Sequence, residues 1–260
     1  MELDLTRLSE FISPLLNKTL APLNMMHISD KTEDEVERLY SDFKTNYIPL
    51  MDNTRAELPN KASNGIRYVT QYQQAVNMGV YASDMAYCCI LGNSQNTLEY
   101  FNLVKNLSIE IGLYEGIDKD LADRVLNNLS ETDTLLSVTS DSYHDVVNYI
   151  EEQGLVDIQC LVVAGAWIES LYLCLEPMKH QELNDETYEL IHDHQVLLEN
   201  LIELLDQNKQ SANVAKLLDE LKLIQSVYDV TYQNKSEKVT QEQFVNIVNT
   251  VCDVRARLII

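Results

Sequence analysis

Apolar residues recur at every third or fourth position along most of this chain, which is the spacing of one face of an α-helix. Glycine and proline, which interrupt helices, number only seven and five in 260 residues. Most of them fall between the periodic stretches, and no Asn-Gly or Asp-Gly pair joins two alternating runs as in a β-hairpin. The sequence therefore predicts an all-α protein, a multi-helix bundle of roughly nine to ten helices with no sheet.

The breaks in the pattern set the predicted helix ends. The predicted helices cover about 3–20, 32–49, 65–91, 95–111, 119–128, 132–153, 156–175, 185–207, 212–232 and the stretch from 241 towards the C-terminus. Residues 155–164 are rich enough in Val, Leu and Ile for a buried strand, but the apolar pattern continues without a turn signal, which favours a helix. We expect one helical domain over residues 1–260, with two packed sub-bundles, 1–130 and 131–260, as the alternative.

The charge excludes some partners. A net charge of −22 should repel nucleic acid and anionic membrane surfaces, since both attract basic proteins. Residues 125–208 hold seventeen carboxylates and only one lysine or arginine, Lys179. Solubility explains this acidity most simply, but the segment 125–208 could also meet a basic partner or the basic ends of its own chain. We expect no nucleic-acid partner.

The most apolar stretch, residues 158–175, is interrupted by Gln159, Glu169 and Ser170. It therefore predicts a buried core helix and no transmembrane segment. The five cysteines are odd in number and match no zinc spacing, and Cys160 and Cys174 lie on this same stretch as small apolar residues.

The histidines give a weak metal signal. A di-iron bundle needs two Glu-x-x-His motifs, and this chain has one, Glu189 to His192, which projects away from the leucine stripe of its helix. His180, His192 and His194 are close in sequence, but a polar stretch separates the first from the helix. We expect no metal and no cofactor, and we interpret His194, which falls on the stripe, as a core histidine with satisfied hydrogen bonds.

Glu169 is the carboxylate in the most apolar surroundings, with Gly165 and Tyr172 among its neighbours at helical spacing. A buried carboxylate is costly unless it is paired or protonated. Either it makes a structural hydrogen bond to a tyrosine or a helix end, or it is an acid facing a pocket. Tyr87 lies on the apolar face of its helix, and Asp84 is a weaker candidate because polar residues share its side. No residue is predicted to be catalytic.

Two glycines, Gly79 and Gly165, lie inside predicted helices rather than between them. A glycine in the middle of a helix costs about 1 kcal/mol relative to alanine, so we expect a compensating reason. Small neighbours flank both, Ala75 and Ser83 in one helix and Ala164 and Ala166 in the other. We predict that these two helices approach each other closely, and that any site adjoins them.

Five runs of the sequence carry a resemblance: 79–87 (Gly-Val-Tyr-Ala-Ser-Asp-Met-Ala-Tyr), 163–172 (Val-Ala-Gly-Ala-Trp-Ile-Glu-Ser-Leu-Tyr), 95–112, 133–136 and 149–151. They resemble a family of uncharacterised all-helical lipoproteins of Gram-negative bacteria. The resemblance covers roughly residues 65–175. It implies export, lipid anchoring through a leader and a cysteine, and a place on the periplasmic side of the cell envelope. It brings no reaction, cofactor or catalytic residue. The chain as written shows neither leader nor anchoring cysteine, so a cytoplasmic location is the alternative.

Three functional hypotheses remain. The first is a non-enzymatic cell-envelope protein, binding or structural, with a protein partner or a small ligand. The second is a ligand-processing enzyme that uses Glu169 in a tyrosine-lined pocket. The third is a cytosolic helical interaction scaffold.

Overall fold

The computed structural model describes residues 57–113, 120–128, 138, 146, 149–150, 152–183, 185–232 and 238–260. None of these residues forms a β-strand, and most lie in helices, which confirms the predicted all-α class for this part of the chain. The helices predicted at 3–20 and 32–49, and most of the one at 132–153, lie outside the described residues.

The described helices follow the predicted order. They are η4 (Ala62–Arg67), α3 (Gln71–Ile90), α4 (Ser94–Glu110), α5 (Leu121–Asn127), α7 (Val156–Leu175), η6 (Glu176–Met178), α8 (Asp185–Gln207), α9 (Ala212–Tyr232) and α10 (Gln241–Leu258), where η denotes a 3₁₀ helix. The bounds of α7, α8 and α9 are those that the apolar pattern predicts. The stretch that could have been a strand, 155–164, lies almost entirely in α7.

Glycine ends three of the helical stretches, as predicted. Gly92, Gly112 and Gly154 have φ values of 69°, 88° and 66°, a left-handed conformation that costs glycine little. After α3, the amide of Gly92 donates to the carbonyl of Cys89, and the amide of Asn93 donates to the carbonyl of Cys88. These two bonds form a Schellman motif, which satisfies carbonyls at the end of the helix.

The predicted start of the long helix at Gly65 is wrong. Residues 62–67 form η4 instead, and α3 begins only after Thr70. Thr70 is extended and forms a capping box: its hydroxyl accepts from the amide of Gln73 at 3.2 Å, and the Gln73 side chain accepts from the amide of Thr70 at 3.3 Å. This reciprocal pair satisfies the first amides of the helix and so fixes its start.

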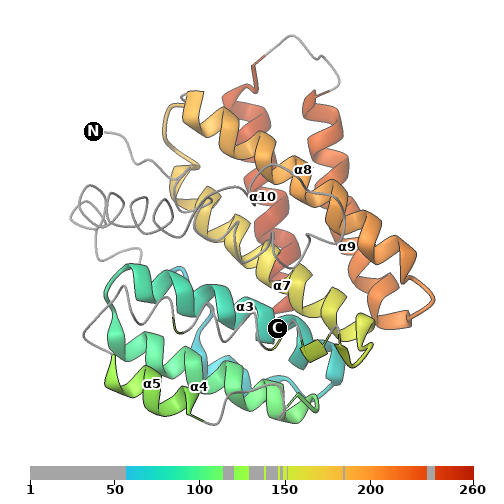
Figure 1. Cartoon of the computed structure of the whole chain (residues 1–260). Coiled ribbons are helices and arrows are strands. Elements are labelled where there is room, and N and C mark those ends of the chain that lie inside the picture. The colour runs from blue at the N-terminus through green and yellow to red at the C-terminus, as the bar shows by residue number, and fades with distance from the viewer. Residues whose placement is uncertain are drawn as a thin grey trace.

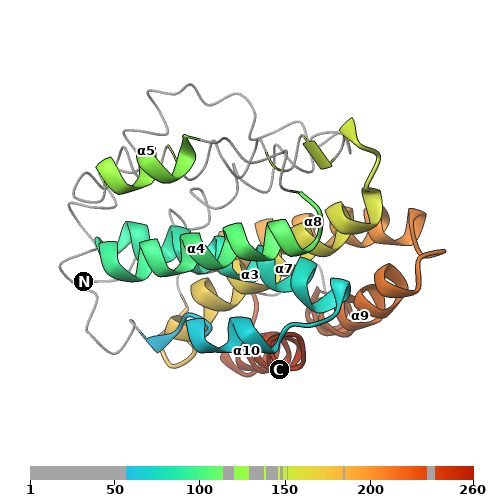
Figure 2. The same cartoon turned by 90° about the horizontal axis from the view of Figure 1, so that it is seen from below.

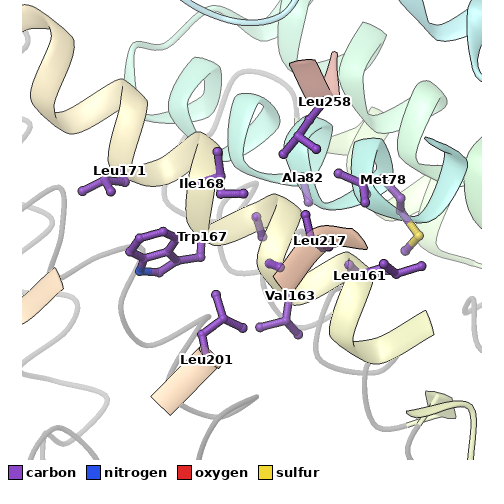
Figure 3. Close-up of a cluster of buried hydrophobic side chains, with 14 of the residues drawn as sticks. Met78, Ala82, Leu161, Val163, Trp167, Ile168, Leu171, Leu201, Leu217 and Leu258 are labelled. Atoms are coloured by element: carbon purple, nitrogen blue, oxygen red, sulfur yellow. The ribbon is translucent and has the colours of Figure 1, made fainter. Parts of the chain in front are cut away.

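The helix α7 is the centre of the described fold (Figure 1). It packs against α3, which also packs against α4, and on its other side against α8, α9 and α10. In the close-up of Figure 3, Trp167, Ile168 and Leu171 of α7 lie in one cluster with residues of the surrounding helices. Those labelled neighbours come from α3 (Met78, Ala82), α8 (Leu201), α9 (Leu217) and α10 (Leu258).

One described segment, Val156–Met178, is long and apolar enough to cross a membrane. However, 94% of its most apolar window is buried inside the protein. Helices from both sides of the fold cover it, as Figure 2 also shows from below. The length and composition of this segment are therefore those of the core helix that the other helices enclose.

The glycines Gly79 and Gly165 lie where α3 and α7 cross. A Cβ atom on Gly79 would overlap the carbonyl oxygen of Val162 and lie 2.7 Å from the nitrogen of Ala166. A Cβ atom on Gly165 would overlap the carbonyl oxygen of Val76 and lie 2.9 Å from its carbon. Each glycine thus faces the backbone of the other helix, and no larger residue fits without moving a helix apart.

Candidate functional site

The side chain of Glu169 forms a buried ion pair with Arg255 of α10. The Nε and Nη2 atoms of Arg255 donate to Oε2 and Oε1 of Glu169, each at 2.6 Å. Glu169 is completely buried and the Arg255 side chain is 10% exposed. A two-bond contact between a guanidinium and a carboxylate is the strongest arrangement of this pair, because both donors match both acceptors.

Two further groups hold the guanidinium of Arg255. Its Cζ atom lies 3.9 Å from the ring centre of Tyr172, which is a cation–π contact. Its Nη2 atom also donates to the carbonyl of Leu58 at 3.3 Å. We call these three groups, the Glu169 carboxylate, the Tyr172 ring and the Leu58 carbonyl, the Arg255 socket.

A second carboxyl group, that of Asp84 on α3, adjoins the ion pair and is also completely buried. Burial raises the pKa of Asp84 well above its ordinary value, and the negative charge of Glu169 raises it further. The amide of Asn60 donates to its Oδ2 atom at 3.1 Å, and a side-chain hydrogen bond to Glu169 is a further cause of the raised pKa. We therefore interpret Asp84 as a neutral carboxylic acid beside a charged pair.

Hydrogen bonds tie this cluster to the end of α10. The Asn60 side chain donates to the hydroxyl of Tyr68 at 2.9 Å, and that hydroxyl donates to the carbonyl of Ile259 at 3.1 Å. The side chain of Asn77 donates to the carbonyl of Leu258 at 2.9 Å. The last carbonyls of α10, which have no partner within the helix, are thus partly satisfied by α3 and the segment before it.

Replacing Asp84 with asparagine should raise the free energy of unfolding at pH 7. Asparagine keeps the acceptor for the Asn60 amide but cannot ionise. In the natural protein the folded-state pKa of Asp84 is raised, so the protein loses the stability that Asp84 contributes as pH rises above about 4. Each pKa unit of the rise corresponds to about 1.4 kcal/mol. Denaturant unfolding of both proteins between pH 4 and pH 8 measures this, and the advantage of Asp84→Asn should shrink towards pH 4.

The control is Asp84→Leu, which leaves the amide of Asn60 buried without an acceptor. It should lower the free energy of unfolding by about 1–3 kcal/mol. If Asp84→Asn were as unstable as Asp84→Leu at pH 7, then Asp84 would have to be ionised in the folded protein.

The structure brings three of the predicted site residues together: Glu169, Tyr172 and Asp84. Among the described residues, Glu169 is paired with an arginine and not with the tyrosine or helix end that one of our two interpretations predicted. Its neighbour Tyr172 contacts that arginine through its ring. Asp84, which the polar residues beside it made the weaker candidate, is in fact as deeply buried as Glu169. Tyr87 is a buried core residue of α3.

The burial of His194 agrees with its interpretation as a core histidine, whereas its satisfied hydrogen bonds stay a prediction. His194 is completely buried, and neither ring nitrogen has a hydrogen-bond partner within the described part of the chain. Its ring centre lies 6.2 Å from that of Trp167, whose indole nitrogen is also buried without a partner there. The apolar stripe places His194 correctly in the core, but a stripe gives no information about polar partners from other helices.

The contribution of His194 to stability should fall as pH drops below 6.5, whereas Asp84 contributes a slope of the opposite sign over the same range. Burial lowers the pKa of His194 to about 4, whereas the unfolded value is 6.5, so the unfolded chain binds the extra proton between these pH values. From pH 7 to pH 5 this single group should cost about 2 kcal/mol. The measurement is the midpoint of chemical denaturation across this range, and His194→Leu should remove that part of the slope. An unchanged slope in His194→Leu would contradict the assigned pKa.

The structure adds Arg255 to the site, and the sequence held a signal for it. In α10 the buried positions include Val248, Val251 and Leu258, and Arg255 falls on the same stripe at helical spacing. A basic residue on an apolar stripe is expected to have an acidic partner. No sequence pattern marked Asn60 and Tyr68 as part of the site. Their hydrogen bonds to Asp84 and Ile259 depend on how distant parts of the chain come together in the fold.

The described residues contain no group of three His, Cys, Asp or Glu side chains that could hold a metal ion. His180 and His192 are both exposed, and His192 lies beside the ring of Tyr232 at 6.2 Å between ring centres. No disulfide joins two of the described cysteines, and Cys160 and Cys174 are buried.

Compared with protein-family models, with curated protein sequences and with solved structures, the chain matches none of them. The similarity of residues 65–175 to envelope lipoproteins therefore stays a prediction.

Proposed function

We propose that this is a non-enzymatic binding or structural protein, a single bundle of nine to ten helices. The observation that carries the proposal is the state of Glu169, the best candidate for a reactive group. Both of its oxygens are bound by Arg255, and it is completely buried. A general acid or base must reach a substrate proton within hydrogen-bond distance, which this carboxylate could do only if Arg255 left.

The tyrosines near the site support the same proposal. Burial raises the pKa of Tyr172 to about 12, and it raises the pKa of Tyr68 and of Tyr81 as well. These phenols stay protonated at neutral pH, so they are poor bases. The hydroxyls of Tyr68 and Tyr81 donate to the carbonyls of Ile259 and Lys61, which are structural contacts. The enzyme hypothesis would require this network to open.

The cell envelope is the location that we propose, and the resemblance of residues 65–175 to envelope lipoproteins supports it. A partner of the acidic segment 125–208 would be basic, although some of these carboxylates already pair with lysines of the chain. Asp206 pairs with Lys209 and Lys222, and Glu176 pairs with Lys179. The cytosolic scaffold is the alternative with the same binding role.

The test uses the native gene product in its source organism. Cell fractionation should recover it with the envelope; recovery in the soluble cytosol would favour the scaffold. Cross-linking in living cells, followed by mass spectrometry, should give the same partner for the natural protein and for Glu169→Leu/Arg255→Leu, which removes the charges but keeps the core filled. If cells that carry the folded double variant lost the partner or a reaction product, that loss would instead support the enzyme hypothesis.

A further inference from the structure

The described groups that hold the guanidinium of Arg255 all come from outside its own helix. Glu169 and Tyr172 come from α7, and the Leu58 carbonyl comes from the segment before η4. The carboxylate binds the edge of the guanidinium, while the aromatic ring covers its face at 3.9 Å. Edge and face are the two ways in which proteins recognise this planar cation, and the Arg255 socket uses both.

Several of the bonds that fix the socket do not involve α10. Asn60 is fixed by its amide bond to Asp84 and by its side-chain bond to Tyr68. On the other side, the hydroxyl of Ser83 donates to the carbonyl of Ala166 at 3.0 Å and lies 3.1 Å from that of Ser170, next to Glu169. These bonds join α3, α7 and the segment before η4 directly. A site whose walls are fixed before the ligand arrives loses little entropy on binding.

We propose that the Arg255 socket is a guanidinium-binding site whose natural ligand is the arginine carried by α10. Binding of this one side chain holds the C-terminal turn of α10 against α3 and α7. A free guanidinium ion takes its place when the side chain at position 255 is shortened. This site goes beyond the proposed binding function, because it concerns how the chain holds its own helix α10.

Arg255→Ala tests whether the bound arginine side chain holds α10 in place. It should lower the melting temperature by about 6–20 °C, because a buried charged pair loses one member. Guanidinium chloride at about 10–30 mM, well below denaturing concentrations, should then raise the melting temperature again in a saturable way. At ten times the dissociation constant the recovery should be roughly 3–6 °C. Urea, which has the same planar shape but no charge, should give no recovery.

The matched control is Arg257→Ala, on the same helix. Arg257 also makes two contacts to one glutamate, Glu220, but its side chain is 43% exposed. This variant should melt within about 4 °C of the natural protein and should not respond to millimolar guanidinium. Glu169→Gln/Arg255→Ala lacks the anion of the socket and should not respond either.

Hydrogen exchange locates the effect. In Arg255→Ala the amides of the last two turns of α10 should exchange faster than those of α7, and guanidinium should restore their protection. If Arg255→Ala is unfolded, guanidinium should restore its helical circular dichroism in the same millimolar range. A variant, folded or unfolded, that responds equally to guanidinium and urea, or to neither, would overturn the proposal.

Discussion

Gly165→Ala should lower the free energy of unfolding by about 3 kcal/mol, and with it the melting temperature by about 6–12 °C. The added methyl group would overlap the carbonyl oxygen of Val76 and lie 2.9 Å from its carbon. These are backbone atoms of α3, so no rotamer change can make room. The helices α3 and α7 would have to separate at the centre of the core.

The sign of this effect is informative. In an uncrowded helix, alanine is more favourable than glycine by about 1 kcal/mol, so propensity alone predicts that Gly165→Ala stabilises the protein. Only the backbone contact between the helices reverses the sign. Thermal melting and urea denaturation both measure the difference, and Gly79→Ala should behave in the same way because it would overlap the carbonyl oxygen of Val162.

Gly65→Ala is the matched control. There the close contact of an added Cβ atom is with the end of the Leu103 side chain, whose Cδ2 atom lies at 2.6 Å and can rotate away, while Tyr81 Cε2 lies at an ordinary 3.9 Å. We expect a change of less than about 1 kcal/mol. Equal losses at positions 65 and 165 would mean that the cost of Gly165→Ala does not come from the contact between α3 and α7.

Local chemistry explains which parts of the fold could be predicted. The ends of α7, α8 and α9 agree with the sequence because an apolar period and the residues that interrupt it are local signals. The start of α3 was also encoded locally, in the capping box of Thr70 and Gln73, but the apolar pattern hid it by continuing back to Gly65.

The site could be predicted only in part, because its contacts are not local. Glu169 stood out as a carboxylate on an apolar helix, yet its partner lies 86 residues away on α10. Asp84 looked solvated beside its polar neighbours. These polar neighbours form hydrogen bonds of their own inside the protein. The side chain of Asn77, for example, donates to the carbonyl of Leu258. A polar face on one helix therefore did not mean solvent, since the end of another helix covers it.

Removing one member of the Glu169–Arg255 pair should cost far more than removing both. Glu169→Leu leaves a buried guanidinium without its anion, and Arg255→Leu leaves a buried carboxylate. Each should lower the free energy of unfolding by about 3–5 kcal/mol. Glu169→Leu/Arg255→Leu buries no unpaired charge, so we expect it within about 2 kcal/mol of the natural protein. Urea denaturation of the four proteins gives the coupling energy directly.

The pair Arg257–Glu220 provides the control cycle, because it joins the same helix to α9 through contacts of 2.6 and 2.9 Å but is partly exposed. Its coupling energy, measured with alanine at both positions, should not exceed about 1 kcal/mol. If the two cycles gave equal couplings, burial would not be what makes Glu169 and Arg255 depend on each other. A large coupling for Glu169–Arg255 alone would show that the core tolerates this carboxylate only because α10 brings its partner, which is also why Glu169 is a poor candidate for catalysis.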